Sequence, residues 1–313
     1  MRAISQDTVG GPDVLHEVEL ERPAPGLSEV LVRVHAAGLN PTDWKHRAFE
    51  LFLGSPPYVL GWDVSGVVEA VGTGVTIFKP GDEVFGMLPY PHGAGSHAEY
   101  VTGPARAFAP KPSTVDHVQA GAVPLAALTA WQALVDTADV RAGQRVLIHA
   151  AAGGVGHLAV QIAKARGAYV IGTASEGKHE FLRGIGADEL IDYREVDFAE
   201  AVHDVDVVLD TIGSDDYRKR SLRTLRRGGL LVSILPMGGK ELVAAAEEAG
   251  VRAELLLVEA DHAGMNAIAE LVEKGALRAE IAGVFPLADA AKAHELGETG
   301  RTTGKLVLQV LGE

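Results

Sequence analysis

From about residue 119, the sequence alternates between short apolar segments and amphipathic segments, and this alternation restricts the possible fold more than any other feature. The apolar segments predict strands at Arg145–Ala150, Tyr169–Ala174, Glu189–Tyr193, Val205–Thr211, Gly229–Leu235 and Ala253–Glu259. Several are continuous apolar runs, as expected for parallel strands covered on both faces. Between the first two strands, Val155–Arg166 carries apolar residues at helical spacing and ends before Gly167. The pattern predicts an α/β fold with a doubly wound parallel sheet of six strands.

A glycine-rich turn follows the first predicted strand, and a helix begins directly after it. Ala151 stands where the usual GxGxxG pattern has its first glycine, so the bare pattern is imperfect, and such glycines can also serve packing alone. Strand, turn and helix nevertheless follow in the order in which a dinucleotide pyrophosphate binds at a helix N-terminus. We expect Gly153 to let the backbone approach the phosphates and Gly156 to let helix and strand pack closely. The predicted cofactor-binding residues of the turn are Ala152, Gly153, Gly154, Val155 and Gly156.

The end of the second predicted strand indicates which dinucleotide binds. Sites for NAD place an acidic residue there, which accepts hydrogen bonds from the ribose 2′-hydroxyl. Here Ser175 and Lys178 offer a hydroxyl and a cation suited to a 2′-phosphate, and the nearest acid, Glu176, comes only after Ser175. A carboxylate would repel the additional phosphate. We therefore predict NADP(H); the alternative is that Ser175 caps the following helix and Lys178 is an ordinary exposed lysine.

Before about residue 119, short Val-rich segments are separated by glycine and proline turns. Examples of these segments are Val30–His35, Ser65–Val71 and His97–Val101. Short strands with frequent turns predict a β-rich, partly closed barrel. Near the C-terminus, Ile281–Phe285 and Lys305–Val310 are predicted strands on either side of a helix. From composition alone, this tail can either extend the parallel sheet or return to the first domain.

Composition excludes several classes of protein. The 313 residues suffice for two domains, and 42 acidic against 28 basic residues give a net charge of −14 with no basic cluster for a nucleic-acid backbone. The absence of cysteine excludes disulfides, thiolate metal sites and a cysteine nucleophile. No N-terminal apolar run is typical of a signal peptide, and no segment approaches the ~18 apolar residues that span a bilayer. We expect a cytoplasmic protein that binds neither nucleic acid nor membrane.

A charged stretch follows the fourth predicted strand. Asp215 and Asp216 are expected to cap the start of a helix. The basic residues that follow are expected to form a solvated helix face and its C-terminal charge; they are Arg218–Arg220, Arg223, Arg226 and Arg227.

Short motifs occur along nearly the whole chain in a characteristic order. They are Ala37–Asp43, Pro57–Gly66, Gly81–Gly86, His97–Val101, Ala127–Trp131, His149–Gly156, Gly186–Asp188 and Gly304–Leu308. In this order they resemble the zinc-independent quinone oxidoreductases of the medium-chain dehydrogenase/reductase superfamily. The resemblance implies a GroES-like substrate and catalytic domain at residues 1–118 and an NADP-binding Rossmann domain at 119–262. Residues 263–313 would return to complete the first domain.

The resemblance also implies further cofactor contacts. Thr129 would lie near the nicotinamide and Tyr193 near the adenosine 2′-phosphate, with Gly304 and Lys305 as additional cofactor-binding residues. The alternatives are that Thr129 caps a helix and that Tyr193 is a core aromatic residue at a strand end. By the same analogy, we expect a homodimer.

Departures from the related zinc alcohol dehydrogenases predict that no metal is bound. Those enzymes have a cysteine where this chain has Asn40, and Gly-His-Glu where it has Gly61–Asp63. Tryptophan cannot coordinate zinc, and an asparagine amide is a poor ligand. His92 and His97 are close in sequence, but no third ligand is evident. We therefore expect direct hydride transfer from a reduced nicotinamide to a quinone or an α,β-unsaturated carbonyl, which accept hydride by conjugation.

The predicted catalytic residues are Asn40, Asp43, Lys45 and Tyr58. Asn40 would donate an amide N–H to the acceptor oxygen as charge develops there, the alternative being a turn amide before Pro41. Asp43 would orient the neighbouring loop, and Lys45 would face either the substrate or solvent. Tyr58 is a possible proton donor or, alternatively, a packing residue.

Together these features predict an NADPH-dependent reductase of a small hydrophobic carbonyl substrate, a quinone or an enone. One alternative is an enoyl thioester or alkenal reductase of the same fold. The other is a nucleotide-binding structural or regulatory protein with little turnover.

Overall fold

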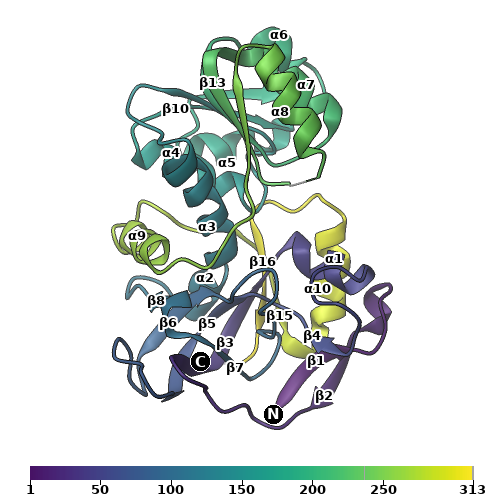
Figure 1. Ribbon diagram of the computed structural model, residues 1–313, viewed down its shortest axis with the longest axis vertical. Helices are drawn as coiled ribbons and strands as arrows, with labels where there is room; N and C mark the ends of the chain where they lie inside the picture. The colour runs from purple at the N-terminus through teal and green to yellow at the C-terminus, as the bar shows by residue number, and fades with distance from the viewer. Residues whose placement is uncertain (236, 312–313) are drawn as a thin grey trace. The chain divides into compact units, whose positions relative to one another are not determined.

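The computed structural model describes residues 1–235 and 237–311, in which the chain forms two compact units (Figure 1). The β-rich unit comprises Met1–Leu128 and Glu259–Glu313, and the parallel-sheet unit comprises Thr129–Val258. The first division lies later in the chain than the expected 118/119, because the helix α2 (His117–Gly121) packs against strands of the β-rich unit. The division at 258/259 lies slightly before the expected 262/263.

The parallel-sheet unit contains the predicted six-stranded parallel sheet. Its strands are β9 (Arg145–Ile148), β10 (Tyr169–Ala174), β11 (Glu189–Asp192), β12 (Val205–Asp210), β13 (Leu225–Ser233) and β14 (Arg252–Leu255). They are hydrogen-bonded in the order β11-β10-β9-β12-β13-β14, all parallel, which confirms a doubly wound sheet. The α-helices of this unit are α4 (Gly156–Ala165), α5 (His179–Gly184), α6 (Phe198–Ala201), α7 (Asp215–Thr224) and α8 (Gly239–Glu248). The helix α3 (Pro124–Trp131) contains the division between the units.

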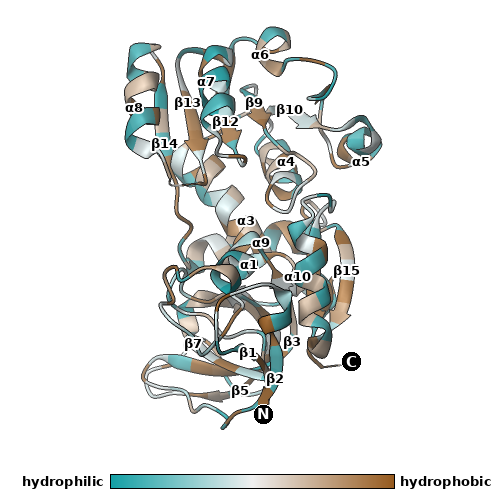
Figure 2. Ribbon diagram, turned by 90° about the vertical axis from the view of Figure 1, so that its right-hand side faces the viewer, coloured by the Kyte–Doolittle hydropathy of each residue, from teal (hydrophilic) through white to brown (hydrophobic). Residues whose placement is uncertain are grey.

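Hydrophobic strands and polar helix faces account for this layered arrangement. Figure 2 shows β9 and β13 in the brown of hydrophobic residues, whereas α7 is largely hydrophilic. Leu147, Val208 and Leu231 on three neighbouring strands are fully buried in one core cluster, together with Phe198 of α6. At about 25 cal/mol per Å² of apolar surface, burial of each such side chain stabilises the unit by about 1.5–3 kcal/mol.

The β-rich unit contains two sheets. The strands are β1 (Arg2–Gln6), β2 (His16–Glu19), β3 (Glu29–Leu39), β4 (Tyr58–Val59), β5 (Asp63–Val71), β6 (Glu83–Met87), β7 (Tyr100–Pro104), β8 (Phe108–Pro110), β15 (Ile281–Pro286) and β16 (Lys305–Gln309). One sheet has the order β2-β1-β4, and the other has the order β15-β16-β3-β5-β6-β8, with β7 also pairing with β3. The predicted β-rich character is confirmed, but among the described residues the sheets do not close, because β15 and β8 remain at opposite ends of the order.

The C-terminal tail belongs to the β-rich unit. Its helices are α9 (His262–Glu273) and α10 (Ala290–Glu298), and α1 (Pro41–Ala48) follows β3 in the same unit. β15 and β16 are parallel and joined through α10, and β16 pairs antiparallel with β3, so that Leu306 lies opposite Leu39. This register brings Lys305 next to the start of α1. In the part of the chain that the structure describes, no helix combines the length and the apolar character needed to cross a membrane.

Candidate active site

The glycine-rich turn joins β9 to α4 with a backbone that only small residues permit. A Cβ atom on Gly156 would lie closer than 3.0 Å to the carbonyl oxygen of Ala150, so any larger residue would push the turn away from the helix. Ala150 itself adopts a positive φ of 44°, a conformation uncommon for residues other than glycine. The turn is fixed to the neighbouring strand because Ala151 N donates to the carbonyl of Thr173 at 3.0 Å. This geometry fits a dinucleotide pyrophosphate at the start of α4.

The carboxyl ends of β10 and β11 hold the residues predicted to choose the dinucleotide. Ala174 lies opposite Asp192 in the parallel register, so the residues that follow, Ser175 and Tyr193, leave the sheet at the same edge. Ser175 is partly buried and Tyr193 is 46% exposed. Lys178 lies in the short helical turn after β10. The structure thus brings these predicted residues to one end of the sheet.

Arg194 was missed by the sequence interpretation. Burial lowers the pKa of Lys178, and the positive charge of Arg194 lowers it further, which shows that the two cations lie near one another. Asp192 is the nearby acid, and backbone N–H groups of Arg194 and Glu176 donate to its carboxylate, each at 2.9 Å. These bonds lower the pKa of Asp192. The position of Arg194, directly after Tyr193, was the only signal in the sequence.

In the β-rich unit, four buried polar side chains form a cluster: Asn40, Asp43, Asp63 and Lys305. Asn40 Nδ2 donates to Asp63 Oδ2 at 2.8 Å, and Asn40 Oδ1 accepts from Lys305 Nζ. Lys305 Nζ also donates to the carbonyl of Leu39 at 2.8 Å and lies 3.4 Å from Asp63 Oδ2. Its three hydrogens therefore all have acceptors within this cluster. The role of Lys305 in cofactor binding stays a prediction.

The cluster fixes the starts of two helices. Asp43 Oδ2 accepts from the backbone N–H of Asn40 at 2.6 Å, which caps α1. Asp63 Oδ1 accepts from the backbone N–H of Leu125 at 2.6 Å, which places a carboxylate at the N-terminus of α3. Gly304, next to Lys305, has a φ of 77°, and a Cβ there would collide with the Glu280 carbonyl, so the chain needs glycine at this turn.

Two buried carboxyl groups share a single ammonium group in this cluster. Burial raises the pKa of Asp43 to about 8, and the charge of Asp63 contributes to that shift. Burial also raises the pKa of Asp63, although Lys305 and Asn40 oppose the change. Backbone N–H groups of Asn40 and Gly61 oppose the rise in the Asp43 pKa. Because burial outweighs them, the carboxyl group of Asp43 is protonated at neutral pH.

The other predicted catalytic residues differ in their surroundings. Lys45 is exposed on α1. The phenol of Tyr58 donates to the backbone carbonyl of His46 at 2.8 Å, so its hydrogen is already used. Thr129 is 4% exposed in the parallel-sheet unit. Of the predicted residues, the structure thus places Asn40, Asp43 and Lys305 in one buried cluster with Asp63, whereas Lys45 and Tyr58 lie outside it, and the roles of all five predicted residues stay predictions.

The histidines and the Trp62 segment show no metal site. Within residues 1–235 and 237–311, no group of three or more His, Asp or Glu side chains is arranged to hold a metal ion. His92 is exposed and lies 3.3 Å from the Phe52 carbonyl, whereas His97 is completely buried. Trp62, at the position of a zinc ligand in related enzymes, is also fully buried.

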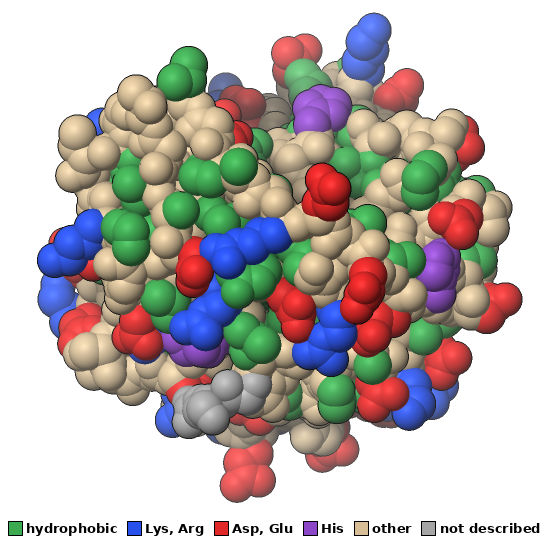
Figure 3. All heavy atoms as spheres, turned by 90° about the horizontal axis from the view of Figure 1, so that it is seen from below, with side chains coloured by type: hydrophobic (Ala, Val, Ile, Leu, Met, Phe, Trp, Pro, Cys, Tyr) green, Lys and Arg blue, Asp and Glu red, His purple; other side chains and the backbone are tan. Residues whose placement is uncertain are grey.

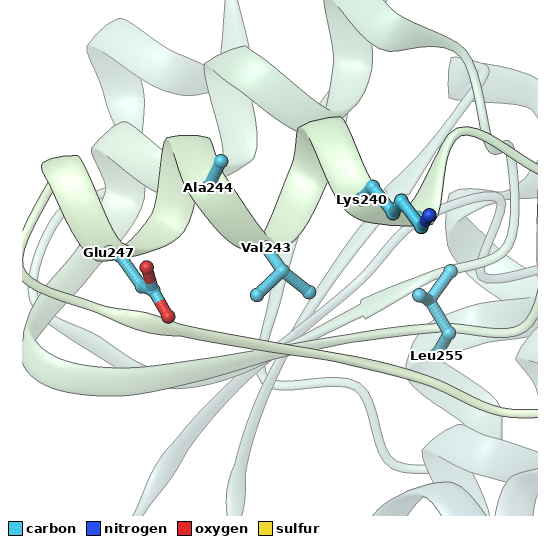
Figure 4. Close-up of a pocket in the computed structure, with 6 residues that line it drawn as sticks. Lys240, Val243, Ala244, Glu247 and Leu255 are labelled. Atoms are coloured by element: carbon cyan, nitrogen blue, oxygen red, sulfur yellow. The ribbon is translucent and has the colours of Figure 1, made fainter.

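A hollow in the parallel-sheet unit lies apart from the predicted site residues. It measures about 550 Å³ between α8 and β14 (Figure 4). Its lining residues are Gly239, Lys240, Val243, Ala244, Glu247 and Leu255. Figure 3 shows one face of the molecule, on which acidic and basic side chains of the described residues are interspersed.

Two family models match the chain. The alcohol dehydrogenase GroES-like domain matches residues 26–113, and the zinc-binding dehydrogenase model matches residues 185–308. A 2-haloacrylate reductase from a Burkholderia species is 38% identical, with 96% of each chain covered.

Solved structures agree with these matches. The quinone oxidoreductase of Coxiella burnetii is 39% identical and superposes with a TM-score of 0.94 over 99% of each chain. An Escherichia coli quinone oxidoreductase complexed with NADPH is 30% identical, with a TM-score of 0.88 over 99% of this chain and 100% of that one. Together with the glycine turn at the sheet edge and the buried polar cluster, these likenesses establish the family. The chain belongs to the quinone oxidoreductases of the medium-chain dehydrogenase/reductase superfamily and is an oxidoreductase that uses a nicotinamide cofactor.

Proposed function

We propose that this protein uses NADPH to transfer a hydride to a quinone or an α,β-unsaturated carbonyl compound. The observation that carries the choice of NADPH is the pair of cations, Lys178 and Arg194, beyond the ends of β10 and β11. The 2′-phosphate of NADPH would neutralise two charges that otherwise repel one another. The nearby Asp192 accepts from the backbone N–H groups of Glu176 and Arg194, and the charge of Arg194 also acts on its carboxylate.

The buried polar cluster supports a role for Asn40 at the acceptor. Its side-chain amide has two hydrogens, of which one donates to Asp63, and the other has no acceptor among the described residues. Lys305, bonded to Asn40 Oδ1, polarises the amide and strengthens its remaining N–H as a donor. Such a fixed donor stabilises the negative charge that develops on a carbonyl oxygen during hydride transfer. The reduced nicotinamide supplies the hydride, and the chain supplies position and polarity.

Cofactor choice is tested by measuring the dissociation constants of NADPH and NADH with wild-type protein and with Lys178→Met. Loss of one hydrogen bond to a charged group costs about 1.5–3 kcal/mol, so we expect NADPH to bind about 10- to 100-fold more weakly, with NADH little changed. Lys219→Met, at an exposed position on α7, is the matched control. Tighter binding of NADH than of NADPH to the wild-type protein would refute the proposal.

The acceptor is tested by following NADPH oxidation with an ortho-quinone, a simple enone and an enoyl thioester. Turnover with the quinone or enone supports the proposal. Activity with the thioester alone would favour the enoyl reductase alternative, and NADPH binding without turnover on any of them would favour a regulatory protein. The 2-haloacrylate reductase relative acts, by its name, on a conjugated acceptor, which supports including an enone in this panel.

A further inference from the structure

A chain of hydrogen bonds leads from α1 to the phenol of Tyr90. His46 Nδ1 lies 2.8 Å from the backbone carbonyl of Thr42 and 3.1 Å from Thr42 Oγ1. Thr42 Oγ1 lies 3.3 Å from the phenolic oxygen of Tyr90. Tyr90 is in the loop that follows β6, so two separate parts of the β-rich unit meet in this chain.

The direction of the chain follows from the carbonyl group. A carbonyl oxygen only accepts, so the ring nitrogen that faces it, His46 Nδ1, carries a hydrogen. Burial lowers the pKa of His46, which keeps the imidazole neutral with Nε2 unprotonated. Thr42 Oγ1 therefore accepts from His46 and donates its own hydrogen to Tyr90. The hydrogen of the Tyr90 phenol is then left without an acceptor among the described residues.

Tyr58, the possible proton donor expected from sequence, has no hydrogen available for a substrate. Its hydrogen bonds to the backbone carbonyl of His46, and breaking that bond would leave a half-buried carbonyl unsatisfied. The phenol of Tyr58 bonds to the backbone of His46, and the phenol of Tyr90 is linked to the His46 ring through Thr42. Of these two phenols, that of Tyr90 has a hydrogen available for donation.

The surroundings of Tyr90 suit a proton donor to an apolar substrate. Its ring packs edge-on against Trp62 at 5.4 Å and against Phe52 at 6.5 Å, and Phe52 is half exposed. Tyr90 as a whole residue is partly buried. Burial raises the pKa of Tyr90, and the hydrogen bond from Thr42 only partly opposes this change. The phenol therefore stays protonated at neutral pH, next to the cluster that holds Asn40.

We propose that Tyr90 is the proton donor that completes the reduction of an α,β-unsaturated carbonyl acceptor. This inference rests on the proposed function, because the reduced nicotinamide supplies the hydride. The hydride forms a C–H bond at the β-carbon, and the electron pair of the C=C bond moves into an enolate. The enolate α-carbon then takes the proton of Tyr90, and the tyrosinate, stabilised by the hydrogen bond from Thr42 Oγ1, recovers a proton from solvent. A quinone needs no such donor, because protonation of the hydroquinone oxygens is easy in water.

The test uses an enone with a substituent at the α-carbon, which becomes a stereocentre on protonation. Wild-type protein should give mainly one enantiomer, since a fixed donor acts on one face. Tyr90→Phe should lower kcat for this enone by about 10²-fold, the usual contribution of a general acid, and should give a nearly racemic product. Its rate with an ortho-quinone should change less than threefold. Tyr100→Phe, in β7 of the same unit, is the matched control and should keep both rate and stereochemistry.

A second readout does not need the loaded enzyme. In protein without cofactor, titration of tyrosine absorbance with pH should show that Tyr90→Phe removes one phenol that ionises above pH 10, and an unchanged late phase would overturn the assignment. Unchanged enantiomeric excess and enone rate in Tyr90→Phe, or their loss in Tyr58→Phe instead, would also overturn the proposal while leaving the function intact. If none of the tested quinones and enones supports NADPH oxidation by the wild-type protein, the proposed function itself is refuted, and the role of Tyr90 is refuted with it.

Discussion

Asp43→Asn should make the folded protein more stable at neutral pH than the wild type. The amide keeps the shape of the protonated carboxyl group, and its oxygen can still accept from the backbone N–H of Asn40. The substitution removes a group that must hold a proton in the fold and loses it on unfolding. Its effect on the free energy of unfolding should therefore depend on pH.

The magnitude follows from the two pKa values of Asp43. The ordinary value is 3.8, and the value in the fold is about 8. Between these two pH values the native state binds one more proton than the unfolded state, so the wild type loses stability as pH rises. The slope is about 1.4 kcal/mol per pH unit, which amounts to roughly 3 kcal/mol between pH 5 and pH 7. Below the ordinary pKa, both states are protonated and the contribution is constant.

The assay is urea unfolding of wild type and Asp43→Asn at pH 5, 6, 7 and 8. The difference in unfolding free energy between the two proteins cancels the contributions of other titrating groups. It should grow with pH in favour of the variant. Asp7→Asn, at an exposed position, is the control and should give a difference with little pH dependence. Parallel pH profiles for wild type and Asp43→Asn would show that Asp43 is ionised in the fold and would refute this reasoning.

Other substitutions give independent checks. Lys305→Met removes the one cation beside two buried carboxyl groups and should lower the free energy of unfolding by about 3–5 kcal/mol in urea titrations; a loss below 1 kcal/mol would contradict the buried pair. Gly156→Ala should weaken NADPH binding at least tenfold by calorimetry, because its Cβ collides with the Ala150 carbonyl; unchanged affinity would contradict the close turn. Burial lowers the pKa of His97 from 6.5 to about 3, so between these values a proton binds to His97 only on unfolding, and this residue contributes a loss of about 1.4 kcal/mol in unfolding free energy per pH unit of acidification. His97→Gln should reduce this slope, and an unaltered slope would assign it to other groups.

Local sequence patterns predicted the parallel-sheet unit well. Continuous apolar strands and the helix after the glycine turn are set by short-range periodicity, and the order β11-β10-β9-β12-β13-β14 follows from the doubly wound rule. Strand ends were less accurate: the last strand was expected at Ala253–Glu259 and is found at Arg252–Leu255. The apolar residues 256–258 extend the hydrophobic pattern without extending the sheet.

Local sequence patterns did not predict which distant strands pair with one another. Lys305 meets Asn40 only because β16 pairs with β3, and no local signal sets that register. Arg218 was expected on a solvated helix face, and this was wrong: it is 3% exposed and pairs with Asp210 at 3.1 Å, and it also donates to Ser233. A run of basic residues in the sequence does not reveal that one of them pairs with a buried carboxylate, here Asp210 at the end of the preceding strand.

The central claim is that a hydride passes directly from NADPH to a conjugated acceptor. The most direct measurement uses NADPH carrying deuterium at nicotinamide C4 on the transferred face, with an enone acceptor in ordinary water and mass spectrometry of the product. We predict one deuterium at the β-carbon and ordinary hydrogen at the α-carbon. A product without deuterium, or no NADPH oxidation with any enone or quinone, would contradict the account.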